Sequence, residues 1–224
     1  MRPFGKPGDG TPNGGGCKRM AASGEEYLDR LACPVCQTRL IRLDSSLECR
    51  ECGICTTLYN QPGRLDFSPF FAKTMTPTVE KVDLAYVIYA KMYAPLALLN
   101  MLAVWRAGLG ALTNHYRRAL LGAPSVILDV ATGDGSLTEL ALHHRSPKGL
   151  LIAFDLSDSM LRQAERCFAR RAWFRSMRGD ARVIPFLNES FDTVCCYGGL
   201  HVIAQPHEAM NSMARVLRKN GRFH

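Results

Sequence analysis

Residues 126–142, VILDVATGDGSLTELAL, constrain the fold more than any other stretch of this sequence. The apolar run VILDV is typical of a buried parallel strand, and SLTELAL continues with the apolar spacing of a helix. Between them lies a turn with two glycines, whose bare backbone amides can face a ligand. Residues 124–224 go on alternating short apolar strands with amphipathic helices. We therefore predict an α/β fold, a Rossmann-like parallel sheet with helices on both faces.

The chemistry of the turn limits what it can bind. A phosphate-binding P-loop would need a lysine and a hydroxyl residue directly after Gly135, which the sequence lacks. A dinucleotide site would need a small residue where Thr138 stands, and would bring the Asp129 carboxylate close to a pyrophosphate of like charge. Asp129 instead favours a cationic group. S-adenosylmethionine fits, because its ammonium can pair with Asp129, the turn amides can receive its carboxylate, and it carries no phosphate.

Two further acids follow at the ends of predicted strands. Asp155 ends the apolar run LLIAFD, twenty residues past Gly135, which is the spacing at which an acid reaches ribose hydroxyls. That spacing also fits NAD. Asp180 lies at the end of a third strand, and SFDTVCCYGGLHVI supplies a fourth strand that opens into a glycine turn. These last two features favour S-adenosylmethionine over NAD.

Residues 25–68 hold five of the nine cysteines, and we assign them to a small zinc ribbon. Two CxxC pairs, Cys33 with Cys36 and Cys49 with Cys52, are separated by twelve residues. This spacing brings four thiolates around one tetrahedral ion, for which zinc is the usual metal. Because protein fills all four positions, we expect the zinc to be structural. Nine cysteines without a secretory leader also indicate a reducing, cytoplasmic location.

Five motifs together resemble the class I S-adenosylmethionine-dependent methyltransferases, in particular the methyltransferase type 11 group that includes the ubiquinone and menaquinone methyltransferases. They are LDVATGDG, FDLSDSML, GDARVIPF, FDTVCCYGGLHVI and MARVLRKNGRF, in the family's order and spacing over about residues 124–223. The resemblance implies that the methionyl part is held by Asp129, Gly133 and Gly135, the ribose by Asp155, and the adenine by Asp180, Ala181 and Met160. It also implies cofactor contacts for Leu156 and Tyr197. Ala131 stands where the family usually has its first glycine, which narrows the turn.

The acceptor is indicated by resemblance alone. A zinc ribbon followed by GRLDF and this fold resembles bacterial 23S rRNA guanine methyltransferases, and also plant plastid and bacterial methyltransferases. The rRNA group typically ends its zinc site with a histidine, where this chain has Cys52, and the segment after the fourth strand looks more like the small-molecule and plastid type. We therefore expect a small, lipid-soluble acceptor, with an rRNA guanine as the alternative. A truncated, catalytically weak protein that binds the cofactor or a partner is the third hypothesis.

His201 lies just after the fourth predicted strand, where the acceptor pocket of this fold opens. A histidine suits proton removal from an oxygen or nitrogen acceptor at neutral pH, so His201 is the candidate catalytic base. The alternative is a loop histidine that only caps or packs.

Residues 75–121 are expected to be helical and to form a lid and linker. By resemblance, Tyr86, Tyr89 and Tyr93 are candidate lid residues at the acceptor pocket, and their spacing puts them on one helical face. The alternative is that they face the core. Residues 84–105 carry a single charge, but a proline, an asparagine and polar flanks argue against a transmembrane span. We expect peripheral membrane contact instead.

The formal net charge of +8 is compatible with RNA as a partner, although the basic residues are spread over the whole length. Arginines 162, 166 and 170 recur every four residues, a stripe that either tracks a phosphate backbone or is the solvated face of a helix. Residues 1–24, rich in glycine and proline, are expected to be a disordered leader. Residues 122–224 are expected to form the cofactor-binding domain. The family's final strands are missing from it, which we expect to expose the edge of the fourth strand.

Overall fold

The computed structural model describes residues 26–44, 46–57, 64–70, 108–122, 126–168, 170–197 and 199–224. The expected leader and the three lid tyrosines Tyr86, Tyr89 and Tyr93 lie outside these ranges. None of the helices in the described ranges combines the length and the apolar character that crossing a bilayer requires.

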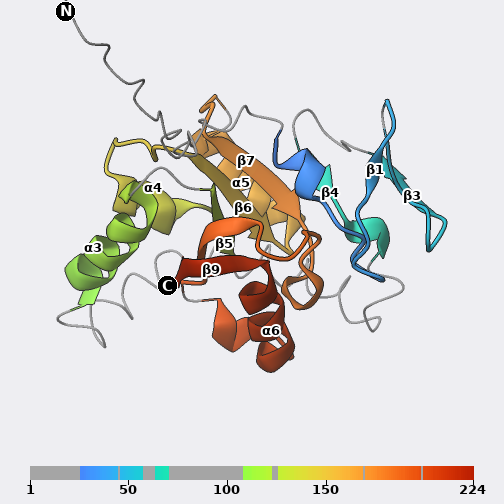
Figure 1. Ribbon diagram of the computed structural model, residues 1–224. Coiled ribbons are helices and arrows are strands. Elements are labelled where there is room, and N and C mark those ends of the chain that lie inside the picture. The colour runs from blue at the N-terminus through green and yellow to red at the C-terminus, as the bar shows by residue number, and fades with distance from the viewer. Residues whose placement is uncertain are drawn as a thin grey trace, which may run out of the picture.

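A six-stranded sheet organises the chain, in the strand order β4-β7-β6-β5-β8-β9 (Figure 1). Its strands are β4 (Arg64–Asp66), β5 (Val126–Val130), β6 (Leu150–Asp155), β7 (Phe174–Arg178), β8 (Phe191–Cys195) and β9 (Leu217–Phe223). Every neighbouring pair is parallel, as predicted. The strand order reverses at β5, which lies between β6 and β8. Open parallel sheets bind their ligands beside such a reversal, at the carboxyl ends of the strands.

Helices cover both faces of this sheet. They are α3 (Gly108–Leu121), α4 (Ser136–Leu142), α5 (Asp158–Phe168) and α6 (Pro206–Val216). Residues of α3, α4 and α5 pack with Ile127 and Leu151 on one face, whereas α6 packs with Leu128 and Ile152 on the other. Successive strand residues point to opposite faces, so the continuous apolar runs of β5 and β6 serve both cores. The predicted α/β architecture is confirmed.

A second, small sheet forms within residues 25–68, which we call the cysteine segment. Its three antiparallel strands, β1 (Ile41–Arg42), β2 (Ser46–Cys49) and β3 (Ile54–Thr57), stand in the order β1-β2-β3. In Figure 1 this sheet lies beyond β4, on the opposite side of the large sheet from α3.

The cysteine segment is joined to the large sheet by backbone hydrogen bonds. Its last strand, β4, pairs in parallel with β7, and the Phe67 amide donates to the Arg178 carbonyl at 2.9 Å. Closer to the first CxxC pair, the Ala32 amide donates to the Pro185 carbonyl at 3.0 Å, and the Leu187 amide donates to the Arg30 carbonyl at 2.8 Å. The prediction of a ribbon over residues 25–68 did not anticipate that this range supplies an edge strand of the large sheet.

The expectation that the edge of the fourth strand would be exposed is wrong. This strand is β8, and β9 pairs with it through Thr193 with Arg222 and Val194 with Phe223. The register shifts between Phe191 and Thr193, and Asn220 adopts a left-handed φ of 62° within β9. Residues 219–221, Lys-Asn-Gly, have the composition of a turn but form a bulge inside the strand, and the residues after them complete the pairing.

Candidate functional site

The three predicted acids lie at one edge of the sheet. Asp129 is near the end of β5, Asp155 is the last residue of β6, and Asp180 follows β7 by two residues. Because β5, β6 and β7 are parallel neighbours, their carboxyl ends meet at the same edge. The Gly179 amide donates to the Asp155 carbonyl at 3.0 Å, which fixes the start of the Asp180 segment beside β6. This edge adjoins the point where the strand order reverses.

The glycine turn lies directly against Asp155. The Gly133 amide donates to Asp155 Oδ2 at 2.8 Å, and a Cβ added at Gly133 would meet no atom within 4 Å, so this side of the turn is open. Gly135 has a left-handed φ of 79°, and a Cβ there would come within 3.0 Å of Phe168 and 3.1 Å of Ala164. Glycine at 135 therefore permits the close approach of α4 to α5. An open turn beside an acid suits a ligand with a carboxylate and a hydroxylated sugar.

Ala131 occupies the first position of the turn in a conformation that favours glycine. Its φ is 54°, in the left-handed region, which costs a residue with a Cβ about 1 kcal/mol. Its methyl group lies against Gly199, the residue that precedes the short 3₁₀ helix η4 (Leu200–Val202). The expected narrowing of the turn is thus accommodated by a glycine on a different segment.

Asp129 is buried beneath three hydroxyl groups. Its Oδ2 accepts hydrogen bonds from the hydroxyls of Tyr116, of Thr132 at 2.6 Å and of Thr138 at 3.2 Å, and the residue is 2% exposed. Burial raises the pKa of the Asp129 carboxyl to about 6, and the three hydroxyls act in the opposite direction because they favour the charged form.

Tyr116, on α3, was not among the residues predicted from the sequence. The signal that was present is its position four residues before Leu120 on the apolar stripe of α3, where a hydroxyl group needs a buried partner.

The other two acids already hold backbone amides. Asp155 Oδ1 accepts from the Ser157 amide at 2.9 Å. Asp180 caps the short 3₁₀ helix η3 (Ala181–Val183): its Oδ1 accepts from the Arg182 amide and its Oδ2 from Arg182 Nε, each at 2.9 Å. A carboxylate oxygen has two lone pairs, so these bonds orient both acids without using all of their capacity to accept from a ligand.

The remaining predicted cofactor residues border the same edge. Leu156 follows β6 and Met160 lies in the first turn of α5; both are half-buried, as are Ala181 on η3 and Tyr197 after β8. The Tyr197 ring packs on Tyr116 with their centroids 4.3 Å apart. Its hydroxyl shares a hydrogen bond of 2.7 Å with Nδ1 of His115, which was also missed from the sequence. His201 lies on η4 and is exposed.

The four cysteines of the two CxxC pairs converge. Their Sγ atoms all lie within 4.8 Å of one another, with Cys33 and Cys49 buried and Cys36 and Cys52 half-buried. The two pairs have the same local geometry: the amide of the residue after each pair donates to the carbonyl of its first cysteine at 2.9 Å. That residue is Gln37 in one pair and Gly53 in the other, and both have a left-handed φ. Four thiols at this spacing fit a zinc ion with Zn–S distances of about 2.3 Å.

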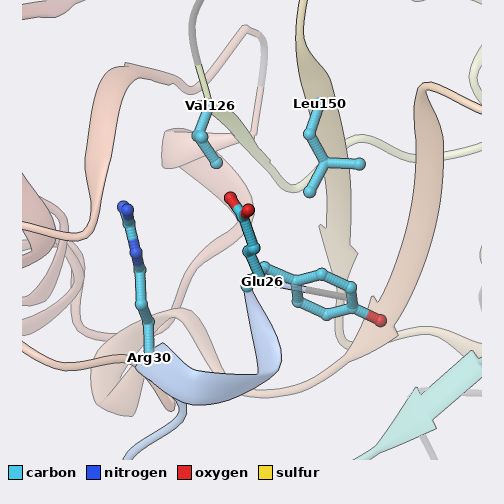
Figure 2. Close-up of a pocket in the computed structure, with 5 residues that line it drawn as sticks. Glu26, Arg30, Val126 and Leu150 are labelled. Atoms are coloured by element: carbon cyan, nitrogen blue, oxygen red, sulfur yellow. The ribbon is translucent and has the colours of Figure 1, made fainter. Parts of the chain in front are cut away.

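A small cavity lies at the opposite end of the strands from the three acids. Glu26, Tyr27 and Arg30 line it together with Val126 and Leu150, the first residues of β5 and β6. Figure 2 shows the Glu26 carboxylate and the Arg30 side chain extending toward Val126. Its volume of about 10 Å³ holds no more than a single water molecule. Because the cavity lies where β5 and β6 begin and the acids lie where these strands end, it is separate from the candidate cofactor site.

Comparisons with known proteins agree with this architecture. The model of the family described as "Methyltransferase domain" matches residues 128–224. The architecture of the large sheet and its helices is the Rossmann-like fold of class I methyltransferases. Over 65% of this chain and 58% of the other, the structure of the [4+2]-cyclase SpnF shares this fold with a TM-score of 0.50 and 19% sequence identity.

Curated relatives carry methyltransferase names. The demethylmenaquinone methyltransferase of Thermus thermophilus is 36% identical over 56% of this chain and 57% of its own length. The ubiquinone/menaquinone biosynthesis C-methyltransferase of Azotobacter vinelandii is 27% identical over 73% of this chain and 66% of its own. The chain thus spans less than two thirds of the length of these relatives.

Proposed function

We propose that this chain is an S-adenosylmethionine-dependent methyltransferase whose acceptor is a small, lipid-soluble molecule. The observation that carries the proposal is the placement of Asp129, Asp155 and Asp180 at one edge of the sheet, with Asp155 bonded to the open glycine turn. The family match and the relatives named for quinone methylation support the reaction and the acceptor class.

Each part of the cofactor has a proposed partner. The Asp129 carboxylate pairs with the ammonium, and the amides of the Gly133 to Gly135 turn receive the methionyl carboxylate. Asp155 accepts hydrogen bonds from the ribose hydroxyls, since Gly133 already holds one of its oxygens in place. Asp180 accepts from the adenine amino group. Leu156, Met160, Ala181 and Tyr197 are the proposed packing residues around the ring and the methionyl chain.

The main contribution of the protein to methyl transfer is to align the cofactor and the acceptor, because the cofactor itself supplies the reactive methyl group. When bound, S-adenosylmethionine supplies a methyl group on a positively charged sulfur that an acceptor attacks in line. The residues of this site fix the position of the cofactor and exclude water, which can supply several orders of magnitude in rate. His201 stays the proposed base for acceptors that must lose a proton.

Calorimetry with S-adenosylhomocysteine tests the cofactor site. We expect micromolar binding to the whole chain, and a loss of at least tenfold in Asp155→Asn, because the neutral amide accepts more weakly from ribose hydroxyls. Asp192→Asn is the matched control: Asp192 lies on β8 near the opposite end of the sheet, where its Oδ2 accepts from the Val126 amide. Equal losses in the two variants would contradict the proposed site.

Methyl transfer tests the acceptor. Methyl-labelled S-adenosylmethionine is incubated with the chain and either a lipid extract or total RNA. We expect the label in the lipid fraction. Label in RNA would replace the lipid acceptor with a nucleic acid. Cofactor binding without transfer to either fraction would favour the catalytically weak binding protein.

We also propose that Cys33, Cys36, Cys49 and Cys52 bind one structural zinc ion, which fits their mutual spacing and the reducing, cytoplasmic location inferred from cysteine usage. Elemental analysis should find about one zinc per chain. Cys36→Ser should lose it, whereas Cys167→Ser, at an exposed cysteine on α5, should keep it. Zinc retained by Cys36→Ser would rule out the four-thiolate site.

A further inference from the structure

Three segments of the chain place a hydroxyl group on the same oxygen of Asp129. Tyr116 comes from α3, Thr132 from the glycine turn and Thr138 from α4, and all three donate to Oδ2. The Tyr116 hydroxyl also lies 2.9 Å from Thr138 Oγ1, so these two side chains fix each other. Within the part of the chain that the structure describes, Oδ1 accepts no hydrogen bond. The two oxygens of this carboxylate therefore differ: Oδ2 is held by the three hydroxyls, whereas Oδ1 has no hydrogen-bond donor among the described residues.

Among the residues that the structure describes, no positive charge balances that of Asp129. The described titratable groups around it contain no cation. They are Tyr116 on α3, Cys195 paired with it on β8, Cys196 and Tyr197 directly after β8, and Asp155 at the end of the neighbouring β6. Tyr116 is 1% exposed, so water does not reach the carboxylate from the α3 side. A buried carboxylate normally has a cationic partner or takes up a proton.

We propose that Tyr116 is a positioning residue for the cofactor: by holding Asp129 through Oδ2, it keeps the carboxylate ionised and leaves Oδ1 for the ammonium of the methionyl group. This inference rests on the proposed function. Tyr116 does not touch the reacting atoms; it acts through Asp129. A tyrosine that merely filled the core of α3 would contribute packing but would not affect the charge of Asp129.

The two roles predict different dependences of cofactor binding on pH. Hydroxyl donors stabilise the ionised carboxylate, so removing one makes the proton bind more tightly. Binding of an ammonium needs the ionised form, and it weakens as the pH falls through the pKa of Asp129, which burial raises to about 6. Loss of the Tyr116 hydroxyl should therefore move the midpoint of the binding profile upward, by about one pH unit for one charge-assisted hydrogen bond.

The test compares Tyr116→Phe with Tyr27→Phe. Each variant removes the hydroxyl of one buried tyrosine, but Tyr27 packs on the other face of the sheet, beside the small cavity. Calorimetry with S-adenosylhomocysteine between about pH 5 and pH 8 gives the dissociation constant of each protein at each pH. We expect Tyr116→Phe to bind up to about tenfold more weakly than the natural chain below pH 6, and within about threefold at pH 8. Tyr27→Phe should keep the natural midpoint.

Two results would overturn the inference. A uniform change in affinity without a shift of the midpoint in Tyr116→Phe would show that Tyr116 only packs. An equal midpoint shift in Tyr27→Phe would show that any buried hydroxyl loss has this effect. No binding by the natural chain at any pH would instead remove the proposed function, and the inference with it.

A second measurement serves if Tyr116→Phe does not fold. Thr138→Val keeps the side-chain shape and removes another of the three donors, so it should shift the midpoint in the same direction by a smaller amount. Carboxyl carbon NMR of aspartate-labelled protein, with Asp129→Asn to identify the resonance, follows the titration of Asp129 without any ligand. A titration midpoint that is the same in Thr138→Val and the natural chain would overturn the inference.

Discussion

The methyl group of Ala131 fills the space that a side chain on Gly199 would need: a Cβ built on Gly199 would lie 2.3 Å from the Cβ of Ala131. The two residues belong to the turns after β5 and β8, the two strands at which the sheet order reverses. An alanine in the first turn thus requires a glycine in the second.

This contact predicts strong coupling between the two positions. Gly199→Ala should destabilise the chain by about 1–3 kcal/mol because it overpacks the contact. The double variant Ala131→Gly/Gly199→Ala should recover at least about 1 kcal/mol of that loss, since glycine at 131 also suits the left-handed φ. Urea unfolding of the four proteins gives the coupling free energy. Additive effects would contradict the contact.

Asp129→Asn should stabilise the fold in the absence of cofactor. Burial raises the pKa of Asp129 from 3.8 to about 6, so the folded state disfavours the ionised form. The natural chain therefore loses stability as the pH rises from about 4 to about 6, and this loss persists above pH 6. The variant should gain on the order of 1–3 kcal/mol above pH 6, and the gain should vanish below about pH 4.

Urea unfolding at a series of pH values measures this gain. The same variant should lose cofactor affinity, because its neutral amide cannot pair with the ammonium. A gain that does not depend on pH would mean that burial of the Asp129 charge is not its cause.

Removal of the proposed zinc ion should destabilise the large sheet as well as the segment that holds the four cysteines. One hydrophobic core contains Leu31, Cys33 and Cys49 together with Phe186 of the main domain. The backbone around Leu31 is also hydrogen bonded to the backbone around Phe186. A zinc site contributes its binding free energy to folding. Treatment with a strong chelator should therefore lower the thermal midpoint of the whole chain by several degrees.

Hydrogen exchange locates this effect. The amide of Leu187, which donates to the Arg30 carbonyl, should lose protection strongly on chelation, whereas the amide of Leu161, within α5, should lose less. Unchanged protection at Leu187 would show that the cysteine segment and the sheet are energetically independent.

Arg64 should be the main electrostatic link between β4 and α5. Its side chain is 2% exposed and pairs with Asp158 and, at 3.5 Å, with Glu165. Arg64→Met should cost about 3–5 kcal/mol because it leaves both carboxylates without this cation. Arg162→Met removes a second, half-exposed partner of Asp158 and should cost less than about 1 kcal/mol, as exposed pairs do. Equal costs in urea unfolding would contradict the burial argument.

The sequence predicted the features whose place in the fold determines their local residue pattern. β5 and β6 are continuous apolar runs because a central parallel strand is buried on both faces. Because the two strands run in the same direction, the acids near their carboxyl ends, Asp129 and Asp155, lie at the same edge of the sheet. The convergence of the four cysteines was predictable from the spacing of the two CxxC pairs. Ala131 was recognised as a departure, but its partner Gly199 was not, because the contact joins two loops far apart in the chain.

Other features depend on contacts that a local pattern does not encode. β4 is a three-residue strand with a buried arginine, and only its pairing with β7 and its ion pairs with α5 make that composition suitable for an edge strand. The partner of Tyr116 is not encoded in the local pattern of α3, since Asp129 becomes its neighbour only when α3 packs on the sheet. The strand β9 contains a turn sequence, which its pairing with β8 converts into a bulge.

The parallel pairing of β4 with β7 has a consequence for the order of events at the ribosome. Arg64 aligns with Ser176, on a strand that is translated much later, so at typical elongation rates β4 waits of the order of ten seconds for its neighbour. During that interval its unpaired backbone is available to other nascent chains. Binding of the proposed zinc ion by the preceding thiols does not require β7, so zinc supply during synthesis would influence the yield of native protein.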